Sequence, residues 1–441
     1  MPRLPGCESS APKATPEPTR APGVPRLREA NRTQVCLRPV DLEGLLPEDH
    51  RARLVWAYVE GLDLTPLYQA IQAVDGEAGR PATDPKILLA LWLYATLEAV
   101  GSARALDRLC TMHVAYQWLC GGVPMNYHTL ADFRTGHGAF LDTLLTQGVA
   151  ALLAEGLVTL ERVAQDGVKV RASAGAASFR RRTTLEQCLA EAAAQVQALR
   201  AELDADPGAT TARQKAARVR AARERQAGVA QALAHLPELE AKKKPEKRTK
   251  ARASTTDPDA RIMKMADGGY RPAFNLQFAT DTGAQVIVGV DASNAGTDHG
   301  QLAPMVDQIE ARHDHAPGAT LVDGGFATKE DIAAVSDRTT VYAPVQKPKD
   351  PTRDPHVPLP KDSPAVAAWR ERMGTPEAQA IYKERAATAE CVNAQARTRG
   401  LRQFSVRGLA KIRTMALWYA LAHNLMRMVA LGVVGGFLHR G

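Results

Sequence analysis

The sequence predicts an α/β protein in which a helical N-terminal domain precedes a core with a mixed β-sheet. Three observations support this. The apolar pattern is helical from Asp41 to about Leu157, it becomes strand-like around Val163, and strands and helices then alternate after Tyr270. A chain of 441 residues is long enough for two or three domains. We expect a tail at 1–40, a helical domain at 41–157 and an α/β domain at 158–440, with an insert at about 176–256.

The charge balance favours an anionic partner. The chain has 56 Lys and Arg residues against 48 Asp and Glu, which gives a net charge of +8. Nucleic acid or an acidic membrane surface would suit such a chain. The Pro-rich start, without an apolar stretch, predicts a disordered tail and no signal peptide. The 6 cysteines form no CxxC pair, so we expect neither a zinc site nor a disulfide framework, and a cytoplasmic protein.

Two apolar stretches resemble membrane spans without having their properties. The stretch from Ile87 to Leu97 is too short to cross a bilayer and suits a buried helix. The stretch from Met415 to Leu438 is long enough, but His423, Asn424 and Arg427 interrupt it. We therefore expect no membrane partner.

The helical N-terminal domain contains recognisable helix starts. Asp84 precedes a proline at the first helical position, and Gly101-Ser102 ends one helix and begins the next. Another helix starts at Asn126 and continues to Arg134. Polar and basic residues at such a start could contact phosphates. An ordinary capped helix in a bundle is an equally good interpretation.

The first core strand is predicted in residues 161–173 (ERVAQDGVKVRAS), and it carries Asp166. A helical insert follows. Apolar residues repeat from Leu185 to Leu203 at steps of four and three, Asp206-Pro207-Gly208 breaks the helix, and a second helix runs from Thr211 to about Leu236. The two helices should form an antiparallel hairpin.

The hairpin ends in a basic tract with a net charge of +6 between Lys242 and Arg252, on a segment that we expect to be flexible because it contains Pro245. It could be only solvated, or it could be an arm that contacts DNA phosphates, which we favour. The basic residues of the tract are Lys242, Lys243, Lys244, Lys247, Arg248, Lys250 and Arg252.

The rest of the core alternates strands and helices. Strands are predicted at 270–280 and 284–292, a helix at 300–312, a strand at 319–323, a helix at 329–336 and a strand at 339–345. A Pro-rich loop at 347–364 and further helices complete the chain. This order resembles a ribonuclease H-like fold with an insert after its first strand.

Two aspartates are the first candidates for chemistry. Asp166 on the first strand and Asp323 at the end of a central strand would lie side by side in such a sheet. Carboxylates at this spacing could hold two divalent ions for phosphodiester cleavage, and hard oxygen ligands suit Mg²⁺ or Mn²⁺. Gly324-Gly325 would let a DNA backbone approach. Either aspartate alone could simply form a turn.

A resemblance to a known family makes this assignment specific. Tyr382, Arg385, Glu390 and Arg397 in YKERAATAECVNAQAR resemble the signature of insertion-sequence DDE transposases, and the segment closely resembles the insertion sequence 1182 group. The segments QDGVKVRASAG and LVDGGFATKEDI resemble those that carry the family's two aspartates. The resemblance covers most of the chain, from about Leu45 to the closing helix. In the family pattern, one fewer residue separates the arginine from the glutamate, and the last basic residue is usually lysine.

The resemblance implies roles for these residues. Asp166, Asp323 and Glu390 would be catalytic and bind two Mg²⁺ or Mn²⁺ ions, while Arg385, Tyr382 and Arg397 would contact DNA. The partners would be double-stranded DNA at the terminal inverted repeats and the target site, with the protein acting as a homo-oligomer, nucleoid-associated when bound. Water would attack first, and the freed 3′-hydroxyl would then join the target strand.

Other residues and other functions remain open. Asp267, Asp291 and Asp298 flank predicted strands, His299 could be a ligand or a base, and Glu384 could replace Glu390 as the third acid. A nuclease or resolvase without strand transfer would keep the same acids. A decayed transposase would only bind DNA. A tyrosine recombinase would use Tyr382 as its nucleophile, but no arginine-histidine-arginine set surrounds it.

Overall fold

The computed structural model describes residues 41–73, 81–205, 212–348 and 350–434, and the described residues from Leu42 onward belong to one unit. The expected tail at 1–40 and the expected helix break at Asp206-Pro207-Gly208 lie outside the described residues.

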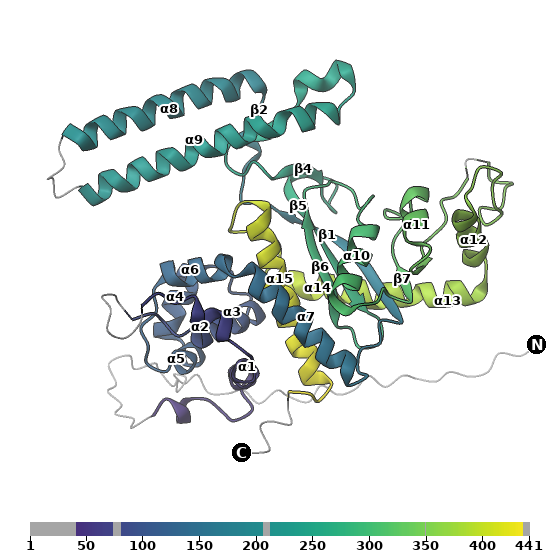
Figure 1. Cartoon of the computed structure of the whole chain (residues 1–441), viewed down its shortest axis with the longest axis horizontal. Helices are drawn as coiled ribbons and strands as arrows, with labels where there is room; N and C mark the ends of the chain where they lie inside the picture. The colour runs from purple at the N-terminus through teal and green to yellow at the C-terminus, as the bar shows by residue number, and fades with distance from the viewer. Residues whose placement is uncertain (1–40, 74–80, 206–211, 349, 435–441) are drawn as a thin grey trace, which may run out of the picture. The chain divides into compact units, whose positions relative to one another are not determined.

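The N-terminal region is helical, as the sequence predicts (Figure 1). Asp84 accepts a hydrogen bond from the backbone N–H of Lys86 (2.8 Å), so the predicted N-cap is confirmed, and Asn126 accepts one from His128 (2.7 Å) at the predicted helix start. The helix that begins at Pro85 is buried along nearly its whole length. The elements of the region are a 3₁₀ turn at Glu43–Leu45, α1 (Arg51–Glu60), α2 (Thr65–Gln69), α3 (Pro85–Leu97), α4 (Ala103–Met112), α5 (Val114–Cys120), α6 (Tyr127–Gly136) and α7 (Gly138–Ala154).

A mixed sheet forms the core of the α/β region. Its strands are β1 (Arg162–Arg171), β4 (Arg261–Lys264), β5 (Tyr270–Asp281), β6 (Ile287–Ser293), β7 (Ala319–Leu321) and β8 (Thr340–Tyr342). The order among the described strands is β4-β5-β1-β7-β8, and β6 also pairs with β5. The pairs that involve β5 are antiparallel, whereas β1, β7 and β8 run parallel. Helix α10 (Leu302–His313) connects β6 to β7, and α11 (Lys329–Val335) connects the parallel strands β7 and β8.

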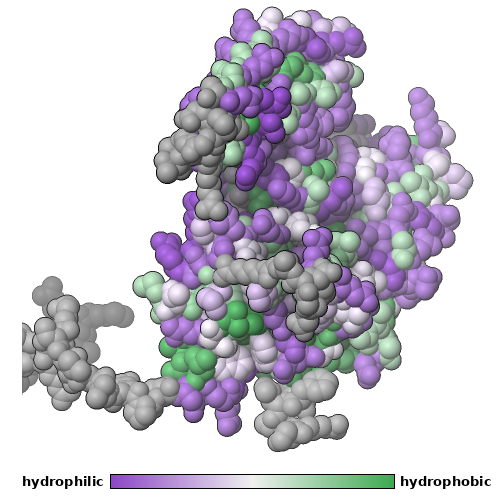
Figure 2. All heavy atoms as spheres, turned by 60° about the vertical axis from the view of Figure 1, so that its left-hand side comes forward, coloured by the Kyte–Doolittle hydropathy of each residue, from purple (hydrophilic) through white to green (hydrophobic). Residues whose placement is uncertain are grey.

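The predicted hairpin is present. Its helices α8 (Arg182–Ala205) and α9 (Ala212–Ala241) lie side by side (Figure 1). A small sheet at its base pairs β2 (Phe179–Arg180) with β3 (Ala253–Ser254), and a turn at Ala176–Ser178 precedes it. In the upper part of Figure 2, where the hairpin lies, hydrophilic side chains surround smaller hydrophobic patches. The basic tract differs from the expected flexible segment because Pro245–Lys250 form a 3₁₀ helix.

The C-terminal helices are α12 (Pro364–Met373), α13 (Pro376–Arg385), a π-helical turn (Ala386–Glu390), α14 (Cys391–Thr398) and α15 (Leu409–Ala430). The last of them connects the two regions. Nε1 of Trp418 on α15 donates to the backbone oxygen of Arg134 (2.9 Å), while the side chain of Asn424 exchanges two hydrogen bonds with the backbone of Ile287 on β6. The helical region and the sheet therefore share α15 as part of one core.

No helix in the described ranges combines the length and the apolar character that a bilayer crossing needs. The two apolar stretches of the sequence contribute instead to the protein core, with the first in α3 and most of the second in α15.

Candidate active site

The sheet brings the two predicted aspartates to neighbouring positions. Ala164 on β1 pairs with Leu321 on β7, and the two strands run parallel. Asp166 and Asp323 each follow their paired residue by two positions, so Asp166 in the middle of β1 lies level with Asp323. Asp323 lies just beyond β7, where its Oδ1 accepts a hydrogen bond from the backbone N–H of Gly325 (2.7 Å). The strand register is therefore what places both carboxylates at one site.

Arg385 lies between the two aspartates. Its Nη2 is 3.6 Å from Oδ1 of Asp166 and 3.9 Å from Oδ2 of Asp323. The Arg385 side chain is only 12% exposed, and its Nε is a buried donor without a partner among the described residues. These ion pairs are longer than ordinary hydrogen bonds, so the guanidinium neutralises the carboxylates while keeping donor capacity for a further anion.

The environment of Asp166 disfavours its charge. Burial raises the pKa of Asp166 to about 6, the positive charge of Arg385 opposes this shift, and the negative charge of Asp323 adds to it. Asn393 on α14 also holds this carboxylate, because its Nδ2 donates to Oδ2 of Asp166 (2.8 Å). A buried carboxylate whose pKa is shifted by burial and by neighbouring charges is typical of a functional site.

Asn393 is a site residue that the sequence analysis missed. Its signal was available, since it lies three residues after Glu390 on the helix that carries the signature. Its Oδ1 is buried and has no hydrogen-bond partner among the described residues, although its Nδ2 is bonded. The side chain therefore offers an unused acceptor beside Asp166.

Tyr382 and Glu390 lie on the same helical segment as Arg385. Tyr382 is half-buried and packs against the cluster around Val322 and Phe326. Burial raises its pKa, Arg385 opposes this, and the charges of Asp323 and Asp166 raise the pKa further, so its hydroxyl belongs to the same site. Glu390 is exposed at the end of the π-helical turn.

The π-helical turn accounts for the extra residue in the signature. A π-helix closes i→i+5 hydrogen bonds, so it accommodates one residue more per turn than an α-helix. Glu390 follows Arg385 by five positions, and the turn Ala386–Glu390 lies between them. Across it, Glu390 takes the position that the fourth residue after Arg385 would have in an α-helix. The helix thus absorbs the additional residue without rotating α14.

The competing third acid, Glu384, faces different partners. It forms an ion pair with Arg162, and its Oε2 accepts a hydrogen bond from Thr282 (3.2 Å). Asp267 and Asp291 are paired with Arg271 and Arg413. His299 is exposed.

The predicted DNA-contacting cations lie at the surface. Arg397 is exposed near the end of α14. All seven basic side chains of the tract are exposed as well, and among them Lys242 pairs with Glu238 (2.6 Å). In the described ranges the ion pairs of Asp166 and Asp323 involve Arg385 and no residue of the tract. The exposed cations of the tract therefore belong to the surface of the hairpin, and none of them pairs with the two aspartates.

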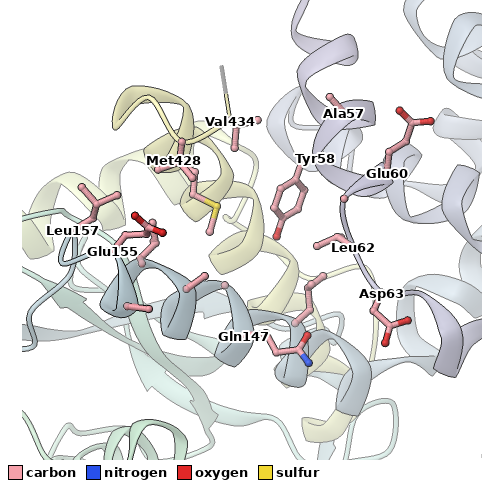
Figure 3. Close-up of a pocket in the computed structure, with 17 residues that line it drawn as sticks. Ala57, Tyr58, Glu60, Leu62, Asp63, Gln147, Glu155, Leu157, Met428 and Val434 are labelled. Carbon is pink, nitrogen blue, oxygen red and sulfur yellow. The ribbon is translucent and has the colours of Figure 1, made fainter. Parts of the chain in front are cut away.

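A large cavity lies away from the aspartates. It has a volume of about 1130 Å³ and is bordered by α1, α7 and the end of α15 (Figure 3). Tyr58, Leu144, Leu152 and Met428 are among its mostly apolar lining residues, and none of Asp166, Asp323 or Arg385 lines it. Its size does not make it the candidate site, because polar chemistry on phosphates needs the charged groups found elsewhere.

The donor set suits a divalent cation only in part. No three His, Cys, Asp or Glu side chains in the described ranges are grouped closely enough to hold a metal ion, so neither Glu390 nor Asp298 completes such a group with the two aspartates. Asp166 and Asp323 nevertheless converge on one nitrogen of Arg385, and Asn393 leaves a buried oxygen unpartnered beside them. The carboxylates of Asp166 and Asp323 are hard oxygen donors, and the single positive charge near them is that of Arg385. Such a pair of carboxylates fits an ion such as Mg²⁺.

The arrangement defines a class of protein, a mixed α/β fold in which aspartates from two adjacent strands face an arginine from a helix. Comparison with known families gives the more particular result. Residues 40–136 match the family described as Transposase domain (DUF772), and residues 353–429 match the family described as Transposase DDE domain. No curated protein and no solved structure matches the chain. The two family matches support an insertion-sequence DDE transposase.

The structure joins the two matched segments. Trp418 lies in the second segment, and it bonds to Arg134 in the first. The second segment also contains Tyr382, Arg385, Glu390 and Arg397, whereas Asp166 and Asp323 lie outside both. The ion pairs of Arg385 therefore link the matched segment to the two aspartates.

Proposed function

We propose that the protein is a transposase that binds the ends of its insertion sequence, cleaves DNA and joins the freed 3′-hydroxyl ends to target DNA. The observation that carries this proposal is the convergence of Asp166 and Asp323 on Arg385, a residue of the segment that matches the DDE family. The signature residues of the sequence further suggest the insertion sequence 1182 group. Action as a homo-oligomer on DNA is part of the same proposal.

We propose a ribonuclease H-like fold for the core. The sheet supports this because β6, β5 and β1 pair antiparallel in succession, while β1, β7 and β8 run parallel. The long hairpin follows β1, as expected for an insert after the first core strand.

We propose that Asp166, Asp323 and Glu390 hold divalent cations. The carboxylates of Asp166 and Asp323 both face the guanidinium of Arg385, and Glu390 would approach them from the π-helical turn. Bound Mg²⁺ or Mn²⁺ would supply Lewis-acid stabilisation of the attacking and leaving oxygens at a phosphodiester. A π-helical turn is a frequent feature of functional sites, which is consistent with this role for the segment.

The chain's own residues would position the DNA. Arg385 has an unpartnered buried Nε, so its guanidinium can donate to a phosphate while it stays near the carboxylates. Tyr382 can place a sugar or base near the reacting strand end, and Arg397 can contact a phosphate further along. Asn393 holds Asp166 in its orientation through the hydrogen bond from Nδ2.

The basic tract supplies a testable part of the proposal. We expect replacement of its Lys and Arg residues by Gln to weaken DNA binding. The plot of log binding constant against log salt concentration should also become less steep, by about 0.9 for each phosphate that is no longer neutralised. Binding to an element end would be measured by fluorescence anisotropy at several salt concentrations. Replacement of its five lysines by arginine keeps the charge and should leave the slope unchanged. An unaltered slope in the Gln variant would mean that the tract is only solvated.

The main alternative is a nuclease or resolvase that cuts without joining, and a strand-transfer assay separates the two. A labelled element end is incubated with the full-length protein and an unlabelled target plasmid, and the products are resolved on a denaturing gel. A transposase gives labelled strands joined to the target. Cleaved ends that are never joined would favour the nuclease, and binding without cutting would indicate a decayed transposase.

A further inference from the structure

Asp298 lies between β6 and α10, and two strand side chains hold it in place. Its Oδ1 accepts hydrogen bonds from Nδ2 of Asn275 (2.7 Å) and from Nε2 of Gln277 (2.8 Å), both on β5. Asn275 and Gln277 are almost completely buried. Two amide donors aimed at one carboxylate oxygen fix the orientation of Asp298.

The amides belong to a larger buried network. Nε2 of Gln165 on β1 donates to Oε1 of Gln277 (3.1 Å) and to the backbone oxygen of Gln301 (2.9 Å). This orients the Gln277 amide so that its nitrogen points to Asp298. Three buried amides in the middle of a sheet are costly unless they are bonded, and apolar side chains would pack there more simply. Their arrangement serves to hold Asp298.

Asp298 and Asp323 border the same space. A Cβ placed on Gly325 would lie 3.6 Å from Oδ2 of Asp298 and 2.9 Å from Oδ1 of Asp323. A Cβ on Gly167, the neighbour of Asp166, would collide with Oδ1 of Asp298. Gly167 therefore leaves room for Asp298 on the face of β1 opposite to the Asp166 side chain, and Gly325 leaves a space that Asp298 and Asp323 both border.

An unpartnered oxygen beside Asp298 marks this region as a place for a cation. Oδ1 of Asn275 is fully buried and has no partner among the described residues, although the side chain's nitrogen is bonded to Asp298. Oδ1 of Asn393 is also buried and unpartnered, but it lies beside Asp166 on the other face of β1. Buried acceptors of this kind need a donor or a cation, and an all-oxygen set of carboxylates and amides suits Mg²⁺ or Mn²⁺.

We propose that Asp298 is a further carboxylate of the cation site and binds a divalent ion together with Asp323 across the space at Gly325. The inference rests on the proposed function, because it assigns an additional ligand to the same site. It differs from the sequence-derived set of Asp166, Asp323 and Glu390 in that Asp298 is already held beside Asp323, whereas Glu390 is exposed.

The test is Mn²⁺ binding to the full-length protein, measured by the loss of the electron paramagnetic resonance signal of free Mn²⁺ in the absence of DNA. We expect Asp298→Asn to weaken binding tenfold or more, since even groups that only orient metal ligands typically contribute about 10–100-fold. Asp307→Asn removes the same charge from α10, where Asp307 pairs with Arg338, and should bind Mn²⁺ like the unmodified protein. Gly325→Ala, which fills the space, should also weaken binding.

The outcomes separate the inference from the proposed function. Wild-type Mn²⁺ affinity in Asp298→Asn, with loss of binding in Asp166→Asn and Asp323→Asn, overturns only the role of Asp298. Failure of the unmodified protein to bind Mn²⁺ overturns the cation site and this inference together. If Asp298→Asn does not fold, as shown by its circular dichroism spectrum, Gly325→Ala decides, and unchanged binding in that variant contradicts the proposal.

Discussion

Asp166→Asn and Asp323→Asn should each lower DNA cleavage about 10³-fold or more while binding to element ends stays within a few-fold of the unmodified protein. Stabilisation of the reacting oxygens at such a site contributes several kcal/mol, and about 1.36 kcal/mol corresponds to a tenfold change in rate. Most DNA contacts would lie elsewhere, on Arg397 and the basic tract, so affinity should change little. Single-turnover cleavage of a labelled end and anisotropy binding measure the two quantities.

The controls address folding and the identity of the third acid. Each Asn variant leaves Arg385 with one fewer ion pair, so its thermal unfolding has to be compared with that of the unmodified protein. Glu390→Gln should lower cleavage as strongly as the aspartate variants, whereas Glu384→Gln should not, because Glu384 is bound to Arg162 and Thr282. Cleavage at the normal rate by Asp323→Asn would remove the acid pair from the mechanism.

Trp418→Ala should destabilise the whole protein by about 3–5 kcal/mol, the usual cost of removing a fully buried tryptophan. Trp418 is completely buried on α15, and its Nε1 donates to the backbone oxygen of Arg134. Because α15 contacts both the helical region and β6, we expect one cooperative unfolding transition that shifts as a unit. Urea denaturation followed by far-UV circular dichroism measures this shift.

Tyr270→Ala is the matched aromatic control for the tryptophan variant. Tyr270 is 69% exposed, so its removal should change the free energy of unfolding by less than about 0.5 kcal/mol. Trp418→Ala could instead unfold in two transitions, one of them at the urea concentration at which the unmodified protein unfolds. That result would mean that the helical region and the sheet are not parts of one core.

Local signals in the sequence were sufficient for most elements of the fold. The caps at Asp84 and Asn126 follow from the hydrogen-bonding capacity of short polar side chains, and both form the expected bonds. The change of apolar period at Val163 places β1, and the alternation after Tyr270 places β5 and β6. Short pairings such as β2 with β3 lacked such a signal, because two residues show no periodicity.

The geometry of the site was only partly predictable. The position of Asp166 beside Asp323 follows from two parallel strands, but the placement of Arg385 between them depends on how α13 packs against the sheet. The extra residue before Glu390 was visible in the sequence, yet nothing in Ala386–Ala389 indicates that a π-helical turn absorbs it. Asn275 and Gln277 alternate along β5 like residues of a solvated face, although both are buried.

The metal dependence of cleavage and joining tests most directly whether the protein uses two divalent ions for its chemistry. A labelled element end and a target plasmid are incubated with the full-length protein in EDTA, and Mg²⁺, Mn²⁺ or Ca²⁺ is then added in excess. We predict no cleavage in EDTA, cleavage followed by joining with Mg²⁺ or Mn²⁺, and binding with little cutting in Ca²⁺, whose larger and looser shell positions a water less well. Full activity in EDTA would contradict the two-metal proposal and direct attention to Tyr382 as a covalent nucleophile, with Tyr382→Phe as the next variant.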